Sequence, residues 1–467
     1  MMASETTSKS PFLSLPNELI LSIVERIDQE NIQDLLNLSL TSRRMCMLSL
    51  DHLYGHLTVR SPWPLLRTIF LSPELASRVH KVTWRYNMKE KHDTAANKPT
   101  LFNSLDELRI PKISGAACCD MQRSQTWLFH EFMETFLMFT PNLHKLIIKD
   151  THAWMGSVYL FKMMAANPDR LVHLKSVHIH ASLLSMEQLA HLFLLPSLRK
   201  VTATDLVLLD RPEGDPLEWN SDMPLQTVLD PGSSAVENIT LKRSCVGIST
   251  LGCFTAACRN LKSFAYEHEY YNDHRMRQYK LPSSSRFSTL ASPLTHTLTT
   301  LEHLSIRGDA RKLDQTHVLQ VARLASGMKY LRSLDMGLLS HDDNPDQCTE
   351  DFVTHLVRFL PSTLEEMTFE IDWQDSWGSK GWVGPTEMLC YIAALAPSKL
   401  NLLKRVAVVD WPPFLGHFPP DFAKLHRCFA EQNIHFASIP AQLEGRHPLQ
   451  WSDYVEPGWV FVEVAEA

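Results

Sequence analysis

A six-residue pattern recurs along most of this chain and restricts its fold more than any other sequence feature. In each copy, an apolar residue is followed by two variable residues, an apolar residue, one variable residue and a third apolar residue. The last four residues alternate between apolar and variable positions, as in a strand that is buried on one face. The sequence therefore predicts a series of short strands. The copies begin at Val79, Leu143, Leu174, Leu198, Val236, Leu261, Leu301, Leu331, Leu364 and Leu403.

Segments with helical spacing of apolar residues separate several of these strands. Strand–helix alternation at intervals of roughly 24 to 40 residues is typical of a leucine-rich-repeat solenoid, whose units bury one another's apolar faces. The predicted fold class is therefore α/β, with parallel strands inside and helices outside. A non-repetitive α/β domain is the alternative, because its buried parallel strands also alternate with helices. The predicted helices are residues 127–139, 186–195, 317–324, 349–360 and 387–396.

A block of three short helices is predicted ahead of the repeats, at residues 11–53. The apolar residues of its first helix recur at helical spacing, at Leu19, Ile20, Ile23, Val24 and Ile27. The expected helix caps are Ser14, then Asn31, then Thr41 or Ser42. Three short helices bury little core by themselves, so we expect their surplus apolar side chains to contact a partner.

Two segments of this block resemble the F-box, the motif that binds the Skp adaptor of cullin-based ubiquitin ligases. They read Leu15-Pro16-x-Glu18-Leu19-Ile20 and Leu35-Leu36-x-Leu38-Ser39-Leu40-x-Ser42-Arg43-Arg44. Met45 stands where the F-box usually has an aromatic residue, and Met is apolar enough to preserve docking. A simple helical cap on the larger domain is the alternative. The adaptor-binding residues that the resemblance implies are Leu15, Pro16, Glu18, Leu19, Ile20, Ile23, Ile27, Leu35, Leu36, Leu40 and Met45.

The repeats resemble the divergent leucine-rich-repeat region that often follows the F-box in fungal proteins. The Asn or Cys that is usual after the third apolar residue is missing here. Together the two resemblances imply the substrate-recognition subunit of a Skp–cullin–F-box ubiquitin ligase. The F-box would bind the Skp adaptor, and through it a cullin, while the solenoid would bind an unknown protein substrate. A non-ligase protein-interaction scaffold with a leucine-rich-repeat fold is the alternative.

The predicted domain organisation has five parts. They are a disordered tail (1–10), the F-box (11–53), a helical linker (54–77), a leucine-rich-repeat-like solenoid with loop insertions (78–435) and a C-terminal cap (436–467). The longest insertions are residues 87–124, 206–234, 267–300 and 372–385. Long insertions in a solenoid emerge as loops and are frequent binding elements.

Composition excludes several classes of partner. The 467 residues carry a net charge of −7 with a pI near 6.3, whereas nucleic-acid-binding proteins are usually basic, so no nucleic-acid partner is predicted. The first ten residues lack the apolar segment of a signal peptide, and no apolar run is long enough to span a membrane. The nine scattered cysteines are typical of reduced thiols. The predicted location is the cytoplasm, the nucleus or both.

No catalytic motif is found, so the chain is predicted to be neither an enzyme nor dependent on a cofactor or metal. His130 and Glu131 lack the second His of a zinc-protease helix, because residue 134 is Glu. The cysteines at 245, 253 and 258 lack the paired spacing of a zinc site, which favours buried thiols. His178 and His180 would point to the same side of one strand, so a metal pair is an alternative to two surface histidines.

The variable positions of the pattern predict a charged strand face that binds the substrate. This face is basic to neutral in the first repeats and turns acidic in the last ones. Such asymmetry suits oriented recognition of a protein or peptide. Randomly placed solvated residues are the alternative interpretation. The predicted substrate-binding residues are Lys145, Lys149, His178, His180, Lys200, Lys242, Arg307, Asp335, Glu366 and Glu370.

Overall fold

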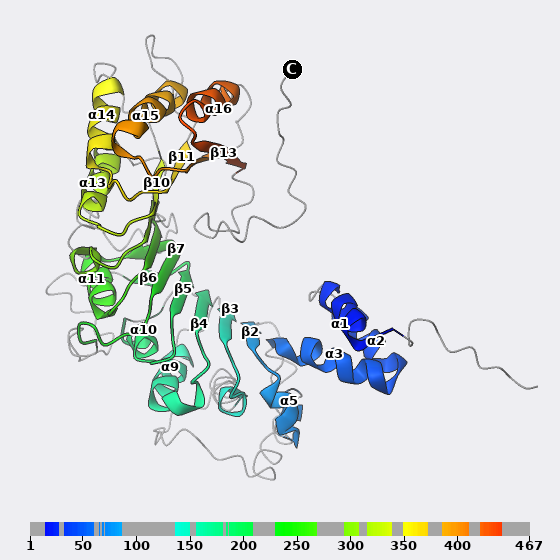
Figure 1. Ribbon diagram of the computed structural model, residues 1–467. Coiled ribbons are helices and arrows are strands. Elements are labelled where there is room, and N and C mark those ends of the chain that lie inside the picture. Colours follow the sequence, from blue (N-terminus) through cyan, green and yellow to red (C-terminus); the bar gives the residue numbers. More distant parts are fainter. Residues whose placement is uncertain are drawn as a thin grey trace, which may run out of the picture. The chain divides into compact units, whose positions relative to one another are not determined.

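The computed structural model contains a helical block followed by parallel strands and helices (Figure 1). The chain divides into two compact units: residues 1–181 with 195–198 form the first, and residues 182–194 with 199–467 form the second. The residues that the structure describes are 15–27, 32–59, 65, 68–69, 71–85, 136–149, 156–180, 184, 186–208, 229–268, 294–307, 315–338, 349–371, 385–410 and 421–440.

The first unit begins with the three predicted helices. They are α1 (Asn17–Arg26), α2 (Ile32–Thr41) and α3 (Arg43–Gly55), and α3 packs against both others. Pro16 precedes α1 without a side-chain cap, and Pro is tolerated there because its missing N–H would have no helical partner. Ser42 caps α3 as predicted. The other predicted caps, Ser14 and Asn31, lie outside the described residues.

Parallel strands complete the first unit. They pair in chain order, each with the next: β1 (His56–Val59), β2 (Lys81–Arg85), β3 (Lys145–Lys149) and β4 (Ser176–His180). The connecting helices that the structure describes are α5 (Pro73–Ser77), α9 (Gly156–Ala166) and the 3-10 helix η3 (Pro168–Arg170).

The second unit repeats the same plan. Its strands pair in parallel in the order β5-β7-β8-β9-β10-β11-β12-β13, and the short β6 pairs with the end of β7. The strands are β5 (Lys200–Thr204), β6 (Val207–Leu208), β7 (Asn238–Val246), β8 (Ser263–His268), β9 (His303–Arg307), β10 (Ser333–Leu338), β11 (Glu366–Ile371), β12 (Arg405–Asp410) and β13 (His435–Pro440).

Helices accompany these strands. They are α10 (Met186–Phe193), α11 (Ile248–Ala257), the 3-10 helix η7 (Thr295–Thr297), α13 (Gln315–Ser326), α14 (Thr349–Phe359), α15 (Pro385–Lys399) and α16 (Phe422–Ala430). Figure 1 shows α13 to α16 as a row along one side of the strands, and each packs against the next. Strands stacked in chain order with helices alongside confirm the predicted α/β solenoid class.

The six-residue pattern builds the core. All three apolar residues are buried in each of the ten copies, from Val79 to Val408. In the first copy, for example, the ring of Trp84 is fully buried and packs edge-on against Phe136, with 6.1 Å between the ring centroids. No unit could bury these side chains alone, so the repeats stabilise one another.

The structure corrects two predicted boundaries. The segment at 54–77 is not purely helical, because β1 lies within it and pairs with β2. Its residues Tyr54, Leu57 and Val59 repeat the six-residue pattern, which was the missed signal. The array also runs past residue 435, because His435–Pro440 forms β13 and pairs with β12.

The helix predictions are mostly confirmed. α10, α13, α14 and α15 cover four of the five predicted segments. Most of the fifth, 127–139, lies outside the described residues, as do the greater parts of the predicted insertions. α9, α11 and α16 were not predicted. α11 is apolar on most of its surface, so its sequence lacks a clear polar face from which to predict it.

Candidate protein-interaction surfaces

The helical block has a small core of its own. Ile20 and Val24 from α1, Leu35 from α2, and Met45 and Leu53 from α3 are buried together. Five partly buried side chains close this cluster at its edges: Leu15, Ile27, Leu38, Leu48 and Tyr54. Met45 is completely buried, so it fills the centre of the block, where a flexible thioether side chain fits an irregular space.

Large apolar side chains remain exposed on all three helices. On α1, Leu19 and Ile23 lie four residues apart, and on α2 Ile32, Leu36 and Leu40 continue the same spacing. Residues four apart share one face of a helix, so each set forms a stripe. Leu40 is 84% exposed, and Met47 adds an exposed apolar side chain on α3. We call the stripes on α1 and α2, together with Met47, the apolar helical surface.

Arg44 fixes the entry to α1. Its Nε and Nη2 atoms donate to Oδ1 of Asn17 at 2.9 and 2.6 Å, and Nη2 also donates to the carbonyl of Leu15 at 2.6 Å. Ser42 orients the helix that carries this Arg, because its hydroxyl accepts from the backbone N–H of Met45 at 3.1 Å. α3 therefore holds the Leu15–Pro16 segment in place beside α1.

Four cations gather on the open strand face of the first unit. Lys81 lies directly opposite Lys145, and Arg85 directly opposite Lys149, on the paired strands β2 and β3. Arg85 and both β3 lysines are exposed, whereas Lys81 is half-buried. Apolar residues between them in sequence, such as Leu146, point to the buried face. We call Lys81, Arg85, Lys145 and Lys149 the cationic face.

Burial and the cationic face together lower the pKa values of two side chains, His56 beside this face and Lys81 within it. Burial lowers the pKa of His56 to about 4, and the nearby charges of Lys81 and Lys145 contribute. Burial likewise lowers the pKa of Lys81, helped by Lys145 and Lys149. His56 is therefore neutral at pH 7, and its Nε2 lies 3.2 Å from the hydroxyl of Thr83.

In the second unit, two pairs of charged side chains on the strand face contact each other. Asp335 is buried to 1% side-chain exposure, where it accepts from Nε of Arg307 at 2.9 Å and from the hydroxyl of Ser305 at 3.0 Å. Glu366 lies 3.6 Å from Arg405 on the next strand. These contacts satisfy the charges internally, because a buried carboxylate is stable only when paired and hydrogen-bonded.

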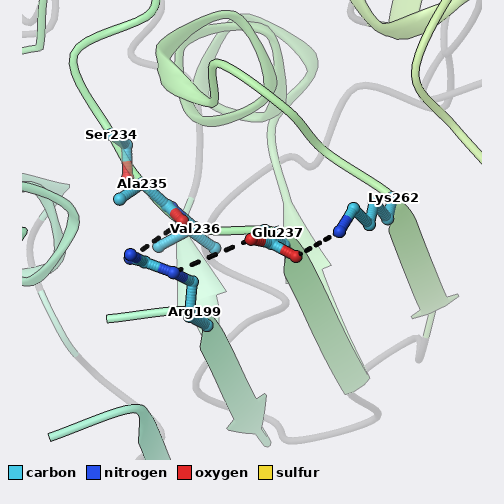
Figure 2. Close-up of polar contacts among 6 residues, drawn as sticks. All are labelled: Arg199, Ser234, Ala235, Val236, Glu237 and Lys262. Carbon is cyan, nitrogen blue, oxygen red and sulfur yellow. Dashed lines mark hydrogen bonds and ion pairs between the residues drawn. The ribbon is translucent and has the colours of Figure 1, made fainter. Parts of the chain in front are cut away.

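A second set of charges in this unit lies one residue before each strand. From β5 to β12, the residues that precede the strands of the main sheet alternate in sign: Arg199, Glu237, Lys262, Glu302, Arg332, Glu365 and Lys404. We call this set the charge ladder. Figure 2 shows one part of it, in which Glu237 lies between Arg199 at 3.7 Å and Lys262 at 2.8 Å.

The same arrangement recurs further along the charge ladder. Glu365 lies 3.9 Å from Arg332 and 2.6 Å from Lys404. A hydrogen bond from Lys404 lowers the pKa of Glu365, and one to Glu237 raises the pKa of Lys262. Glu302 is placed between its neighbours by backbone hydrogen bonds of 2.8 Å on either side. Each ladder carboxylate thus lies between two cations in the sequence of repeats.

Comparison with known proteins bears on the helical block. Residues 12–60 match the F-box-like family model. The F-box-like domain thus includes α1, α2, α3 and β1, and ends within the predicted linker.

No curated protein matches the chain. Among solved structures, a TLR13–ssRNA13 complex matches with 13% identity and a TM-score of 0.32. The match covers 65% of this chain and 33% of the TLR13 chain, so this protein spans about a third of the length of TLR13.

The predicted adaptor-binding residues lie at different depths in the domain. Ile20, Leu35 and Met45 are enclosed in the core of the F-box-like domain, so they support its surface from beneath. Leu15 and Ile27 are half-buried. The predicted residues that are exposed are Pro16, Glu18, Leu19, Ile23, Leu36 and Leu40. Sequence reasoning missed Ile32 and Met47, although the spacing of Ile32 with Leu36 and Leu40 could have found the first.

The predicted substrate-binding residues also differ in exposure and pairing. Arg307 and Asp335 form the buried cluster described above, Glu366 is paired, and Lys242 is half-buried with a pKa lowered by burial. Lys200, His178 and His180 are half-buried and make interactions of their own, and the side chain of Glu370 lies outside the described residues. Lys145 and Lys149 remain exposed, and the structure adds Lys81 and Arg85 beside them. These two were missed because long insertions separate the strands that bring them together.

The remaining predictions concern thiols, metals and membranes. Six cysteines in the described part of the chain are free thiols, and burial raises the pKa of Cys258 to about 12. Within that part, no group of three or more His, Cys, Asp or Glu residues is arranged to hold a metal ion. Among the described helices, none has the length and hydrophobicity needed to cross a membrane.

Proposed function

We propose that this protein is the substrate-recognition subunit of a Skp–cullin–F-box ubiquitin ligase. Its F-box-like domain would bind the Skp adaptor through the apolar helical surface, and its strand array would bind a protein substrate. The chain would itself perform no chemistry. It would raise the effective concentration of the substrate beside the ubiquitin-transferring subunits, in the cytoplasm or nucleus.

One observation carries this proposal. The F-box-like domain leaves Leu19, Ile23, Ile32, Leu36, Leu40 and Met47 exposed, whereas the three apolar pattern positions are buried in each of the ten repeats. Stripes of large apolar side chains exposed on the helices of a folded domain are typical of a protein-binding surface. The anchored Leu15–Pro16 segment beside α1 would extend the same surface.

The test is adaptor binding by a doubly charged variant, Ile23→Asp with Leu36→Asp. Both side chains are exposed, so the domain should still fold, whereas two carboxylates would face an apolar partner. We expect the affinity for a purified Skp adaptor to fall by about a hundredfold or more, as measured by isothermal titration calorimetry. Leu402→Asp is the matched control, because Leu402 is a comparably exposed Leu in the second unit. Equal affinity of the double variant and wild type would overturn the assigned surface.

A second function differs in the partners recruited. As a non-ligase scaffold, the protein would bind the adaptor without a cullin, or would use the block only to cap the repeats. Mass spectrometry of proteins captured with the full chain separates these outcomes. The ligase proposal expects both adaptor and cullin peptides, and expects both to disappear with Ile23→Asp/Leu36→Asp. Adaptor without cullin would favour the scaffold.

A further inference from the structure

The cationic face places like charges against each other. Lys81 faces Lys145, and Arg85 faces Lys149, across one strand pair. Directly opposed residues on neighbouring strands lie about 5 Å apart at Cβ, where like charges destabilise a sheet. The two pairs are four residues apart along the strands, a separation of about 13 Å. The result is two rows of positive charge on the same face of β2 and β3.

Nothing among the described residues neutralises these charges. None of the four cations of the cationic face makes an ion pair there, unlike Arg199, Lys262, Arg332 and Lys404 of the charge ladder. The strand neighbours on either side, His56 and His180, supply no carboxylate. In a chain of net charge −7, four cations that make no ion pair with any described residue are not a consequence of composition.

We infer that the cationic face binds an acidic segment of a partner protein, with Asp or Glu carboxylates facing its two rows. This inference deepens the proposed function by naming the chemistry of the substrate. An extended peptide has the same spacing per residue as a strand, so carboxylates four residues apart can reach both rows. Half-buried Ile147, between the rows, offers an apolar contact to the intervening side chains.

A protein partner fits this face better than a nucleic acid. Proteins that bind single-stranded nucleic acid combine positive charge with aromatic side chains on which the bases stack. Among the described residues of the open face of β1 to β4, none is Phe, Tyr or Trp, and Trp84 points into the core. The acidic net charge of the whole chain also opposes long-range attraction of a polyanion.

The test uses the full chain and a fluorescent peptide of about 12 residues with Glu or Asp at every second position. A matched peptide carries Gln or Asn at those positions. Fluorescence anisotropy should show binding of the acidic peptide only, and binding should weaken as salt rises to about 0.3 M. Lys145→Glu with Lys149→Glu should lower the affinity at least about tenfold.

The control variant is Lys329→Glu with Arg358→Glu. It changes the net charge by the same amount, at two exposed positions of the second unit that make no ion pair in the described structure. It should bind the acidic peptide as wild type does. Equal binding of the acidic and amide peptides would overturn the inference. So would wild-type affinity in Lys145→Glu/Lys149→Glu, or tighter binding of a single-stranded oligonucleotide than of the acidic peptide.

Adaptor binding is measured on the same samples, which separates this inference from the proposed function. Retained adaptor affinity with no peptide binding would refute the acidic partner alone. Peptide binding that depends on the cationic face, with no adaptor affinity, would refute the ligase role and leave the acidic partner in place.

Discussion

The strands of the two units carry charges in different relations to one another. In the second unit, charges alternate along the ladder from Arg199 to Lys404, and Asp335 is enclosed with Arg307. In the first unit, the residues at the ladder position are Gly55, His80, His144 and Lys175, and the strand face itself opposes Lys81 with Lys145. Both units have the same repeat pattern, and in both the successive strands pair in parallel. The difference in charge arrangement therefore lies in the variable positions of the pattern.

This difference teaches which charges hold the fold and which are available to a ligand. Paired charges between adjacent repeats contribute to stacking, although modestly where they are exposed. Opposed cations cost stability, and such departures from a favourable arrangement are expected at functional sites. The same repeat pattern can thus carry charges that pair with one another in the second unit and, in the first, the cationic face that we propose binds a ligand.

The largest effect is expected at the buried charge cluster of the second unit. Asp335→Asn would remove the buried carboxylate that accepts from Nε of Arg307, while the guanidinium stays largely buried. Breaking a buried pair in this way costs about 3 kcal/mol in the free energy of unfolding. Urea unfolding of the full chain measures it. The double variant Arg307→Met/Asp335→Leu removes both charges and should recover most of the loss, and a loss below about 1 kcal/mol for Asp335→Asn would show that the pair is not structural.

A smaller effect is expected along the charge ladder. Glu237→Lys would place three cations in a row along the charge ladder, from Arg199 to Lys262, so like charges would be neighbours there as they are on the cationic face. The melting temperature should fall by about 1 to 2 °C at low salt, and less at high salt because exposed charges are screened. Glu237→Gln should lower the melting temperature by less, since it removes the attraction to Arg199 and Lys262 without adding repulsion. A salt-independent loss would point to packing instead of charge.

The smallest effect has the opposite sign. Lys145→Glu would place a carboxylate opposite Lys81, so the melting temperature should rise by about 1 °C while the affinity for an acidic peptide falls. A variant that loses both stability and binding would contradict the contrast between the units.

His56 reports the same change at a single residue. Its pKa, near 4 in the wild type, should rise in Lys145→Glu, as read from NMR titration of its ring. The folded pKa lies below the ordinary value, so this residue's contribution to stability is full above pH 6.5 and is lost as the pH falls toward 4. The variant should lose less stability over that range. An unchanged His56 pKa would mean that burial alone sets it.

Much of the strand array could be predicted from the sequence. The six-residue pattern identified ten strands because an apolar triplet on a strand has little alternative to burial, and all ten triplets are buried. β13 was missed because the first position of the six-residue pattern is occupied there by Asn433, a polar residue at positive φ, and not by an apolar residue. The signal weakens where the array ends.

The details of the two surfaces could not be predicted in the same way. Leu19 and Ile20, or Leu35 and Leu36, are equally apolar neighbours, and only the packing of α3 determines which of each pair is buried. The opposition of Lys81 to Lys145 depends on strand register across a long insertion, which periodicity does not reveal. Charge pairing in the second unit also depends on strand register. The sequence therefore showed a charged face, but not which of its charges pair with one another.

The most direct test of the bridging role measures both partners at once. Labelled acidic peptide, Skp adaptor and the full chain are mixed and followed by analytical ultracentrifugation. We expect the peptide to sediment with the adaptor only when the chain is present. Ile23→Asp/Leu36→Asp should release the adaptor alone, and Lys145→Glu/Lys149→Glu the peptide alone. Displacement of the peptide by the adaptor, or loss of both partners in either variant, would contradict two separate binding surfaces on one receptor.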